Sequence, residues 1–288
     1  MTSNRLMVAA VLLLLSAFVS GAAAQESYRI EGLAEGVYAA LAVPGGRATS
    51  NGLIVVTHDW VLAAGAHMTR DAVADLLAAV AEVTPRPVDY FVLPHHHRGF
   101  AFTDFDFPSS MQVLMSGQTW AGLQSEIPAV IYPTLFFSEG LTLKSAQQSV
   151  VLSNLGRGHA EGDVILFLPE SGILFASDLL YVGSIGFLGD GHMEDWVMAL
   201  EFIQRLAPEK IVPGYGKVSD VAAVGKFKDF LRDFLSAVLL LLEEGKPLEQ
   251  VKKEFRLPKY EGMPGFKQFR DVNLERAYHD LQEGVLSR

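Results

Sequence analysis

The residues of this chain best suited to chemistry lie in one short segment, Pro-His-His-His-Arg-Gly-Phe at residues 94–100. The segment follows the apolar run of residues 89–93, which predicts a compact buried strand. Side chains of an extended segment alternate with a period of two, so His95 and His97 should lie on one face while His96 points the other way. Layered α/β folds place chemistry in polar loops at strand ends, so this loop is a candidate metal site.

Two further candidates flank a predicted hairpin. Residues 164–168 and 172–176 are apolar runs joined by the turn Pro-Glu-Ser at 169–171. His159 ends the sequence Gly-Arg-Gly-His before the first strand, and Asp178 follows Ser177 after the second. His159 and Asp178 are therefore expected at the open ends of adjacent strands, although Asp178 could instead cap the segment that follows it.

These residues allow two kinds of metal chemistry. His95, His97 and His159 would give three neutral nitrogen ligands, which suit a zinc ion with an open fourth position for water. Such an ion lowers the pKa of its water towards ~7, and Asp178 would orient that water or accept its proton. His95, His159 and Asp178 would instead form the two-histidine, one-carboxylate set associated with non-haem iron oxygenases. We expect one divalent metal, with zinc favoured and iron as the alternative.

The elements that position these residues follow from hydrophobic spacing and turn residues. Three short runs, residues 36–41, 52–56 and 59–63, suggest an antiparallel start to a sheet. Thr69 is a candidate N-cap for a helix over residues 69–83. Further strands are expected at residues 111–115, 127–131, 141–143, 148–152 and 210–214. Helices are expected at residues 193–206, 220–245, 247–255 and 272–283, where the last three look like packing material rather than a site.

The first 24 residues have the pattern of a secretory signal. Arg5 precedes the apolar run of residues 6–19, and Gly-Ala-Ala-Ala at 21–24 is a small-residue cleavage site. The alternative is an uncleaved anchor, but the run is shorter than the roughly 20 residues that a spanning helix needs. The apolar run of residues 231–242 contains Arg232 and Asp233 and therefore indicates a buried or amphipathic helix. We expect an exported protein, periplasmic or secreted, with no membrane attachment after cleavage.

Composition excludes several classes of function. The chain has 288 residues and no cysteine, so any metal must be held by His, Asp or Glu. Without residues 1–24 it carries 22 basic and 33 acidic residues, a net charge of −11. This balance argues against nucleic acid and against an anionic membrane surface as partners, and leaves a small-molecule substrate as the expectation.

The order of the motifs resembles that of the metallo-β-lactamase fold superfamily. A strand leads to His-x-His, then come Gly-x-Gly-His, a hairpin ending in Asp, and Val-Pro-Gly-x-Gly, over about residues 31–218. The resemblance implies an α/β protein, a four-layer αββα sandwich with a helical C-terminal extension. Residues 25–218 would form the metallo-β-lactamase-like domain, with residues 219–288 packed on it.

The resemblance also implies which metal site is kept. In the family, His95, His97 and His159 would hold the first metal, and Asp178 would touch both metals. The positions of the second metal's other ligands are Gly99, Phe100 and Tyr215 here, and neither Gly99 nor Phe100 can bind a metal through its side chain. An Asp that supports the metal loop in the family falls at about Gly65. One site is thus retained and the other dismantled, so we do not expect β-lactam hydrolysis.

The leading hypothesis is a metal-dependent hydrolase in which metal-bound hydroxide attacks an ester, lactone or amide. Asp178 is the candidate proton acceptor, and Tyr215 would hydrogen-bond substrate or an oxyanion, or else fill the lost second site. One alternative is a non-catalytic member that binds a ligand or partner through the phenylalanine-rich residues 100–107. The other is an iron-dependent oxidoreductase, because the sulfur dioxygenases of this superfamily are similar in using two histidines and a carboxylate.

The other aromatic and histidine residues are expected to be structural. Phe100, Phe102, Phe105 and Phe107 should pack in the core rather than line a cleft. His192 is expected in a surface turn or helix cap, and His58 and His67 at the surface.

Overall fold

The computed structural model describes residues 27–66, 69–97, 105–126 and 132–286. The predicted signal at residues 1–24, the predicted strand at residues 127–131, and His67, Gly99, Phe100 and Phe102 lie outside these ranges.

The first sheet has seven strands in sequence order from β1 to β7. The strands are β1 (Tyr28–Ala34), β2 (Val37–Ala42), β3 (Gly52–Val56), β4 (Val61–Ala64), β5 (Tyr90–Val92), β6 (Gln112–Ser116) and β7 (Thr134–Phe137). The first four pair antiparallel, as the sequence predicted for the three runs that form β2, β3 and β4, and the last three join in parallel. Parallel strands need crossover connections, and one of these carries the histidine segment beyond β5.

The second sheet has five strands in the order β12-β11-β10-β9-β8. They are β8 (Gly140–Lys144), β9 (Ser149–Asn154), β10 (Val164–Leu168), β11 (Ile173–Tyr181) and β12 (Lys210–Tyr215). The predicted hairpin is confirmed, because β10 and β11 pair antiparallel with Leu166 opposite Phe175. β12 pairs parallel with β11, which brings Tyr215 beside Tyr181.

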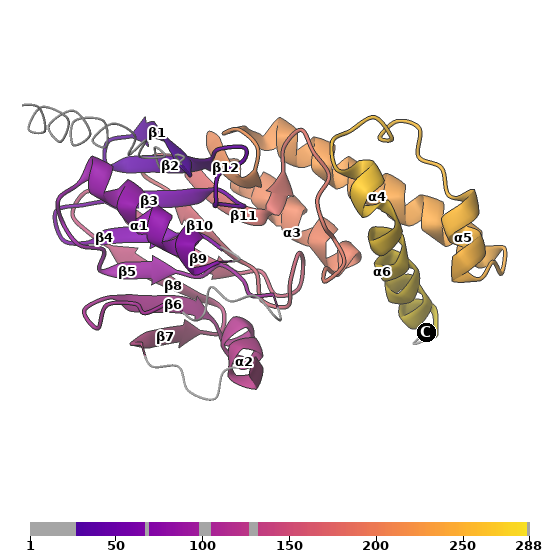
Figure 1. Ribbon diagram of the computed structural model, residues 1–288, viewed down its shortest axis with the longest axis horizontal. Helices are drawn as coiled ribbons and strands as arrows, with labels where there is room; N and C mark the ends of the chain where they lie inside the picture. Colours follow the sequence, from indigo (N-terminus) through magenta and orange to yellow (C-terminus); the bar gives the residue numbers. More distant parts are fainter. Residues whose placement is uncertain (1–26, 67–68, 98–104, 127–131, 287–288) are drawn as a thin grey trace, which may run out of the picture.

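The described residues form six helices. They are α1 (Arg70–Val83), α2 (Gly117–Glu126), α3 (Met193–Leu206), α4 (Val221–Glu243), α5 (Leu248–Glu254) and α6 (Phe266–Leu286). α1 lies on the first sheet, and α3 to α6 extend from the second sheet towards the C-terminus (Figure 1). Thr69 caps α1, since its side chain accepts a hydrogen bond from the Ala72 N–H.

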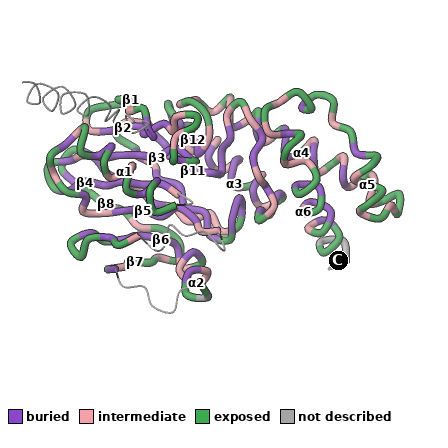
Figure 2. Tube along the Cα trace, in the orientation of Figure 1, coloured by how far each residue is buried: buried purple, intermediate pink, exposed green. Residues whose placement is uncertain are grey.

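Alternation along the strands produces three buried layers of apolar side chains. In β3, Leu53 faces the second sheet whereas Ile54 packs towards α1. In β11, Phe175 lies between the sheets whereas Leu174 packs against α3 and α4. Buried residues lie in both sheets and on the helix faces that pack against the sheets, whereas most residues of α5 are exposed (Figure 2). The expected four-layer αββα sandwich is confirmed.

The structure also contains elements that the sequence did not predict. β1, α2 and β7 were not expected, and α6 begins at Phe266 rather than near residue 272. β11 continues past the predicted hairpin to Tyr181, so Asp178 lies within the strand and does not cap a following segment.

Candidate metal centre

The histidine loop is fixed where it leaves β5. The Leu93 N–H donates to the Leu114 carbonyl at 2.9 Å, and the Val164 N–H donates to the Pro94 carbonyl at 2.8 Å. The loop therefore bridges the two sheets at this point. His95 is buried, and His96 points away from it to place Nε2 3.1 Å from Glu126 Oε1 at the end of α2. The predicted alternation of the three histidines is confirmed.

His159 lies in a tight loop between β9 and β10. The Gly158 N–H donates to the Ala160 carbonyl at 3.0 Å, and the Ala160 N–H donates to Asp163 Oδ2 at 3.0 Å. The His159 ring lies edge-on against the ring of buried Trp196, with centroids 5.1 Å apart. This packing fixes the direction in which the imidazole points.

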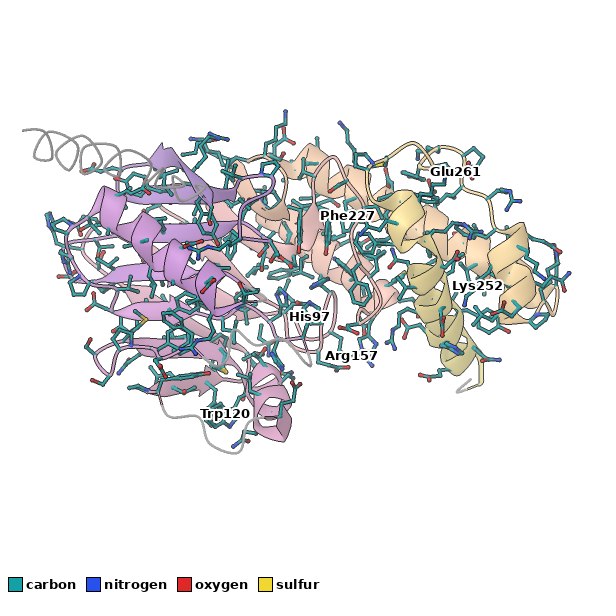
Figure 3. All side chains as sticks on the ribbon, in the orientation of Figure 1. His97, Trp120, Arg157, Phe227, Lys252 and Glu261 are labelled. Carbon is teal, nitrogen blue, oxygen red and sulfur yellow. The ribbon has the colours of Figure 1, made fainter. Side chains whose placement is uncertain are left out.

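His95, His97 and His159 converge on one point. One ring nitrogen from each lies within 4.8 Å of the others, and the Nε2 atoms of His97 and His159 are 2.8 Å apart. His97 lies between the strands and the C-terminal helices (Figure 3). Among the residues that the structure describes, this is the one group of three such side chains that could hold a metal ion.

Asp178 reaches the histidines because β11 is irregular there. Ser177 has a φ of +48°, and the pairing of β11 with β12 shifts register around it, as at a β-bulge. Asp178 Oδ2 lies 3.6 Å from His95 Nε2 and 3.8 Å from His159 Nε2. Gly214 in β12 leaves room for the carboxylate, since a Cβ there would lie 2.2 Å from Asp178 Oδ1.

Burial controls the protonation of these groups. It lowers the pKa of His159 well below its usual value, and nearby His97 lowers it further, so His159 is neutral and its ring can donate a lone pair. Burial raises the pKa of Asp178 to about 7, and nearby Asp163 adds to the rise while His97 opposes it. Burial likewise raises the pKa of Asp163 to about 7, against a hydrogen bond from the Ala160 N–H.

Two acidic residues that the sequence analysis missed contact the histidines from outside. Asp190 Oδ2 lies 2.9 Å from His97 Nδ1, and this hydrogen bond lowers the pKa of Asp190. Asp163 Oδ1 lies 4.0 Å from His95 Nδ1. Asp163 stands four residues after His159, a local signal, whereas Asp190 is 93 residues from His97 and no sequence spacing indicates the pair.

Tyr215 lies at this site together with a second tyrosine that the sequence analysis did not single out. Its ring stacks on Tyr181 with centroids 4.6 Å apart and planes 4° from parallel. The Tyr215 side chain also hydrogen-bonds Asp178, which lowers the pKa of the carboxyl. Tyr215 is half-buried, so it both fills space beside the histidines and contributes a polar group.

A cavity of about 410 Å³ opens beside His97, His159 and Asp178. Part of its wall is formed by residues 264, 265 and 269, at and just before the start of α6. The expectation that the helical tail serves only as packing is therefore wrong. The sequence carries no periodic signal for this contact, because it depends on how the tail folds back over the second sheet.

The remaining predicted residues lie elsewhere. Phe105 and Phe107 pack with Phe91 and Tyr132 in the core beneath α1, so these two rings form no exposed binding surface. His192 occupies the N-cap position of α3, one of the two places predicted for it. Its side chain makes no capping hydrogen bond, and its Nε2 lies 2.9 Å from Glu161 Oε1. His58 is exposed, as expected.

The residues present fit a divalent metal. Three imidazole nitrogens converge in a mostly buried site. The Asp178 carboxylate lies within 4 Å of both His95 and His159, the two most buried of the three histidines. Imidazole nitrogen suits zinc and iron alike, and either three histidines or two histidines and Asp178 can serve as the donor set. The three histidines and Asp178 thus form a donor set that fits a divalent metal ion.

Known proteins are similar to the part of the chain that contains these residues. The sequence model of the metallo-beta-lactamase superfamily matches residues 89–215, which include His95, His97, His159, Asp178 and Tyr215. Residues 89–215 belong to the metallo-β-lactamase superfamily. The resemblance inferred from the order of motifs is thereby confirmed.

Curated relatives of the superfamily domain match at low identity. Metallo-beta-lactamase type 2 of Bacteroides fragilis is 24% identical over 106 residues, 35% of this chain and 43% of the relative. Human acyl-coenzyme A thioesterase MBLAC2 is 27% identical over 124 residues, 41% of this chain and 44% of the relative. The aligned part spans less than half the length of each of these relatives.

Solved structures show the same fold over a longer stretch. A metallo-beta-lactamase from Pontibacter korlensis superposes with a TM-score of 0.59 at 21% identity, covering 71% of this chain and 99% of that one. Metallo-beta-lactamase IND-7 gives a TM-score of 0.61 at 18% identity, covering 72% and 99%. At this identity the likeness establishes the metallo-β-lactamase fold alone.

Proposed function

We propose that the protein is a metal-dependent hydrolase that uses one divalent metal to cleave an ester, thioester, lactone or amide. The observation that carries the proposal is the convergence of ring nitrogens from His95, His97 and His159 within 4.8 Å beside a cavity. Three nitrogen donors with an open position are typical of catalytic zinc sites, so zinc is the favoured metal.

When bound, the metal supplies a Lewis acid that brings the pKa of water to about 7 and polarises a substrate carbonyl. Asp178 faces the same point from β11 and is placed to orient the attacking water and accept its proton. Tyr215 lines the cavity and donates its one hydroxyl proton to the Asp178 carboxylate. To stabilise a developing oxyanion, the hydroxyl would have to turn from Asp178 to the substrate. Asp190 holds the His97 ring from the other side.

The relatives support this class of substrate. One relative is named a metallo-beta-lactamase and another an acyl-coenzyme A thioesterase, and a β-lactam is a cyclic amide whereas acyl-coenzyme A is a thioester. Their substrates differ from each other, and this chain has Gly99, Phe100 and Tyr215 where a second metal would find ligands in the family. The proposal is therefore a one-metal enzyme with a small-molecule substrate other than a β-lactam.

The first test is metal content. The protein is purified without chelator or affinity metal, and its zinc and iron are measured beside those of a His97→Ala variant. Close to one equivalent of metal, reduced in the variant, supports the proposal. If there is no bound metal and no uptake of added zinc or ferrous iron, the protein is a non-catalytic member of the fold. Iron together with oxygen consumption would favour the oxygenase alternative.

The second test is hydrolysis of a panel of esters, thioesters and lactones. His95→Ala and His159→Ala should abolish turnover, whereas His96→Gln should retain it, since His96 points towards α2. If the two alanine variants hydrolyse the panel as well as the unaltered protein does, the mechanism is wrong. The His96 variant controls for general disruption of the loop.

Export remains part of the proposal. Among the described residues, no helix combines the length and apolar character needed to cross a membrane. We propose that residues 1–24 direct export and are removed. The N-terminal sequence of protein recovered from outside the cytoplasm should begin at Gln25, and an intact Met1 on exported protein would contradict cleavage.

A further inference from the structure

The cavity beside the metal centre is lined mainly by carbon on the side away from the histidines. This apolar wall consists of Ile185 and Phe187, from the loop after β11, and Pro264 and Phe269, from the C-terminal extension. Of the described residues that line the cavity, Asp178 is the one acidic side chain, and none is Lys or Arg. The apolar wall thus lies next to the groups proposed to perform the chemistry.

The two segments of the apolar wall are joined by backbone contact. The Ile185 N–H donates to the Pro264 carbonyl at 2.9 Å. Gly265 has a φ of +82°, and a Cβ there would lie 2.0 Å from the Ile185 carbonyl oxygen, so glycine alone permits this approach. The rings of Phe187 and Phe269 meet edge to face, with centroids 6.5 Å apart.

A buried side chain of α6 holds the loop that carries Phe187. Asn273 Oδ1 accepts from the Leu188 N–H at 2.8 Å, and its Nδ2 donates to the Gly186 carbonyl at 3.0 Å. Asn273 is buried, so both hydrogen bonds are shielded from water. The apolar wall is therefore a built feature of the folded protein and is present before any ligand arrives.

The chemistry of the apolar wall selects among the substrates of the proposed hydrolase. A phosphate, a sugar or a charged side chain placed against it would lose hydration without gaining a partner. A hydrocarbon chain would gain from leaving water, by about fourfold in affinity for each buried methylene. The volume of about 410 Å³ lies in the range of pockets that enclose small ligands.

We propose that this cavity receives the unbranched acyl chain of an ester or thioester, whose carbonyl then lies at the histidines and Asp178. The inference rests on the proposed function, because it names the substrate class of the same site. Phe187 and Phe269 are then specificity-determining residues, and the C-terminal extension forms part of the substrate site.

Binding is measured first, with straight-chain alcohols from ethanol to decanol, which are neutral and cannot be hydrolysed. Calorimetric titration of the full chain should show affinity rising about fourfold per methylene until the cavity is filled. Phe187→Asn and Phe269→Asn should flatten this rise. Phe202→Asn is the matched control, because Phe202 is also half-buried but lies on α3 outside the cavity.

Hydrolysis of p-nitrophenyl esters from acetate to decanoate is measured in parallel. In the unaltered protein kcat/KM should rise with chain length. The two variants of the apolar wall should lose most of that rise, whereas Phe202→Asn should keep it. Phe187 and Phe269 lie in different segments of the chain. If one variant does not fold, the other variant and the chain-length series of the unaltered protein still test the proposal.

The outcomes separate the two proposals. Hydrolysis that does not depend on chain length, with no preference among the alcohols, overturns the inference and leaves the hydrolase intact. Chain-dependent binding of alcohols without turnover of any ester overturns the hydrolase and the acyl substrate with it. If Phe187→Asn and Phe269→Asn bind alcohols and hydrolyse esters as Phe202→Asn does, the acyl chain binds elsewhere and the inference is overturned.

Discussion

His97 is held at both of its ring nitrogens. Nε2 faces His159 at 2.8 Å, and Nδ1 faces Asp190 at 2.9 Å. A carboxylate on the outer nitrogen of a ligating histidine fixes the ring and makes its other nitrogen a better donor. Asp190 is itself kept in place by α6, since Arg276 Nε donates to the carbonyl of the next residue, Gly191. The resemblance placed a supporting Asp at about Gly65, where this chain has no side chain to offer. Asp190 supports the histidine loop instead, from the opposite part of the sequence.

Replacing Asp190 with Asn should therefore weaken metal binding without unfolding the protein. Loss of such a supporting carboxylate costs about 10–100-fold in metal affinity. Zinc affinity is measured by competition with a chromophoric chelator. Glu194→Gln is the charge-matched control, because Glu194 is exposed on the first turn of α3. If the two variants lose affinity equally, net charge rather than the hydrogen bond to His97 is responsible.

Gly214 has an equally specific role, because Asp178 occupies the space where a side chain would stand. The Cβ of Gly214→Ala would lie 2.2 Å from Asp178 Oδ1 and 2.7 Å from its Cα, so backbone must move. Overpacking of this kind costs about 1–3 kcal/mol of unfolding free energy. Urea unfolding should show the loss, together with weaker zinc binding as Asp178 is displaced.

The matched control for Gly214 is Gly225 in α4. A Cβ there would lie 3.3 Å from the end of the Gln204 side chain, which can move. Gly225→Ala should be neutral or stabilise α4 by up to about 1 kcal/mol. A Gly214→Ala protein as stable as the unaltered one would show that Asp178 tolerates the added methyl group.

At the scale of single residues, the sequence predicted the converging side chains better than the residues that support them. His95, His97, His159 and Asp178, which the structure brings together, were predicted because each borders an apolar run of the sequence. Asp190 and Tyr181 were not, because their roles depend on contacts between distant segments that no local spacing reveals.

Among the elements, α4 shows how the C-terminal extension is attached. Its buried side chains recur at helical spacing, as the sequence predicted, and they join the core on the outer face of the second sheet. Phe234 packs against Phe230 and against Phe255, which follows α5. Leu240 lies on the same helix but is 62% exposed.

The contrast gives a prediction at this scale. Phe234→Ala should lower the unfolding free energy by about 3–5 kcal/mol, because a large side chain leaves a cavity in the shared core. Leu240→Ala on the same helix should change it by less than about 0.5 kcal/mol. Chemical denaturation measures both. If Phe234→Ala lowers the unfolding free energy as little as Leu240→Ala does, α4 contributes little to the core.

The elements that the sequence missed lacked a strong apolar face. In α2, Thr119 and Leu123 are the buried residues among those whose burial is described, too few for a clear helical pattern. Its start does carry a local signal, since the Ser116 hydroxyl accepts from the Thr119 N–H at 3.1 Å. β7 is an edge strand with exposed Leu135 and Phe136, so the alternation of a half-buried strand is absent.

Across the whole molecule, the candidate metal centre joins parts that are far apart in the sequence. His95 and His97 follow β5 of the first sheet, whereas His159 lies in a loop between two strands of the second sheet and Asp178 lies in a third. Asp190 is held by the C-terminal helix. A metal bound to these residues would cross-link both halves of the sandwich. Its binding energy would then be added to the stability of the folded state, because the unfolded chain brings no such set together.

Zinc should accordingly stabilise the whole fold against heat. At a free concentration 100 times the dissociation constant, binding adds about 2.7 kcal/mol to the unfolding free energy. Calorimetry in zinc and in chelator measures the shift in Tm. His97→Ala should lose most of this shift, whereas His96→Gln should keep it. A shift of equal size in His97→Ala would place the bound zinc away from the three histidines, because the loss of one ligand should weaken zinc binding at this site.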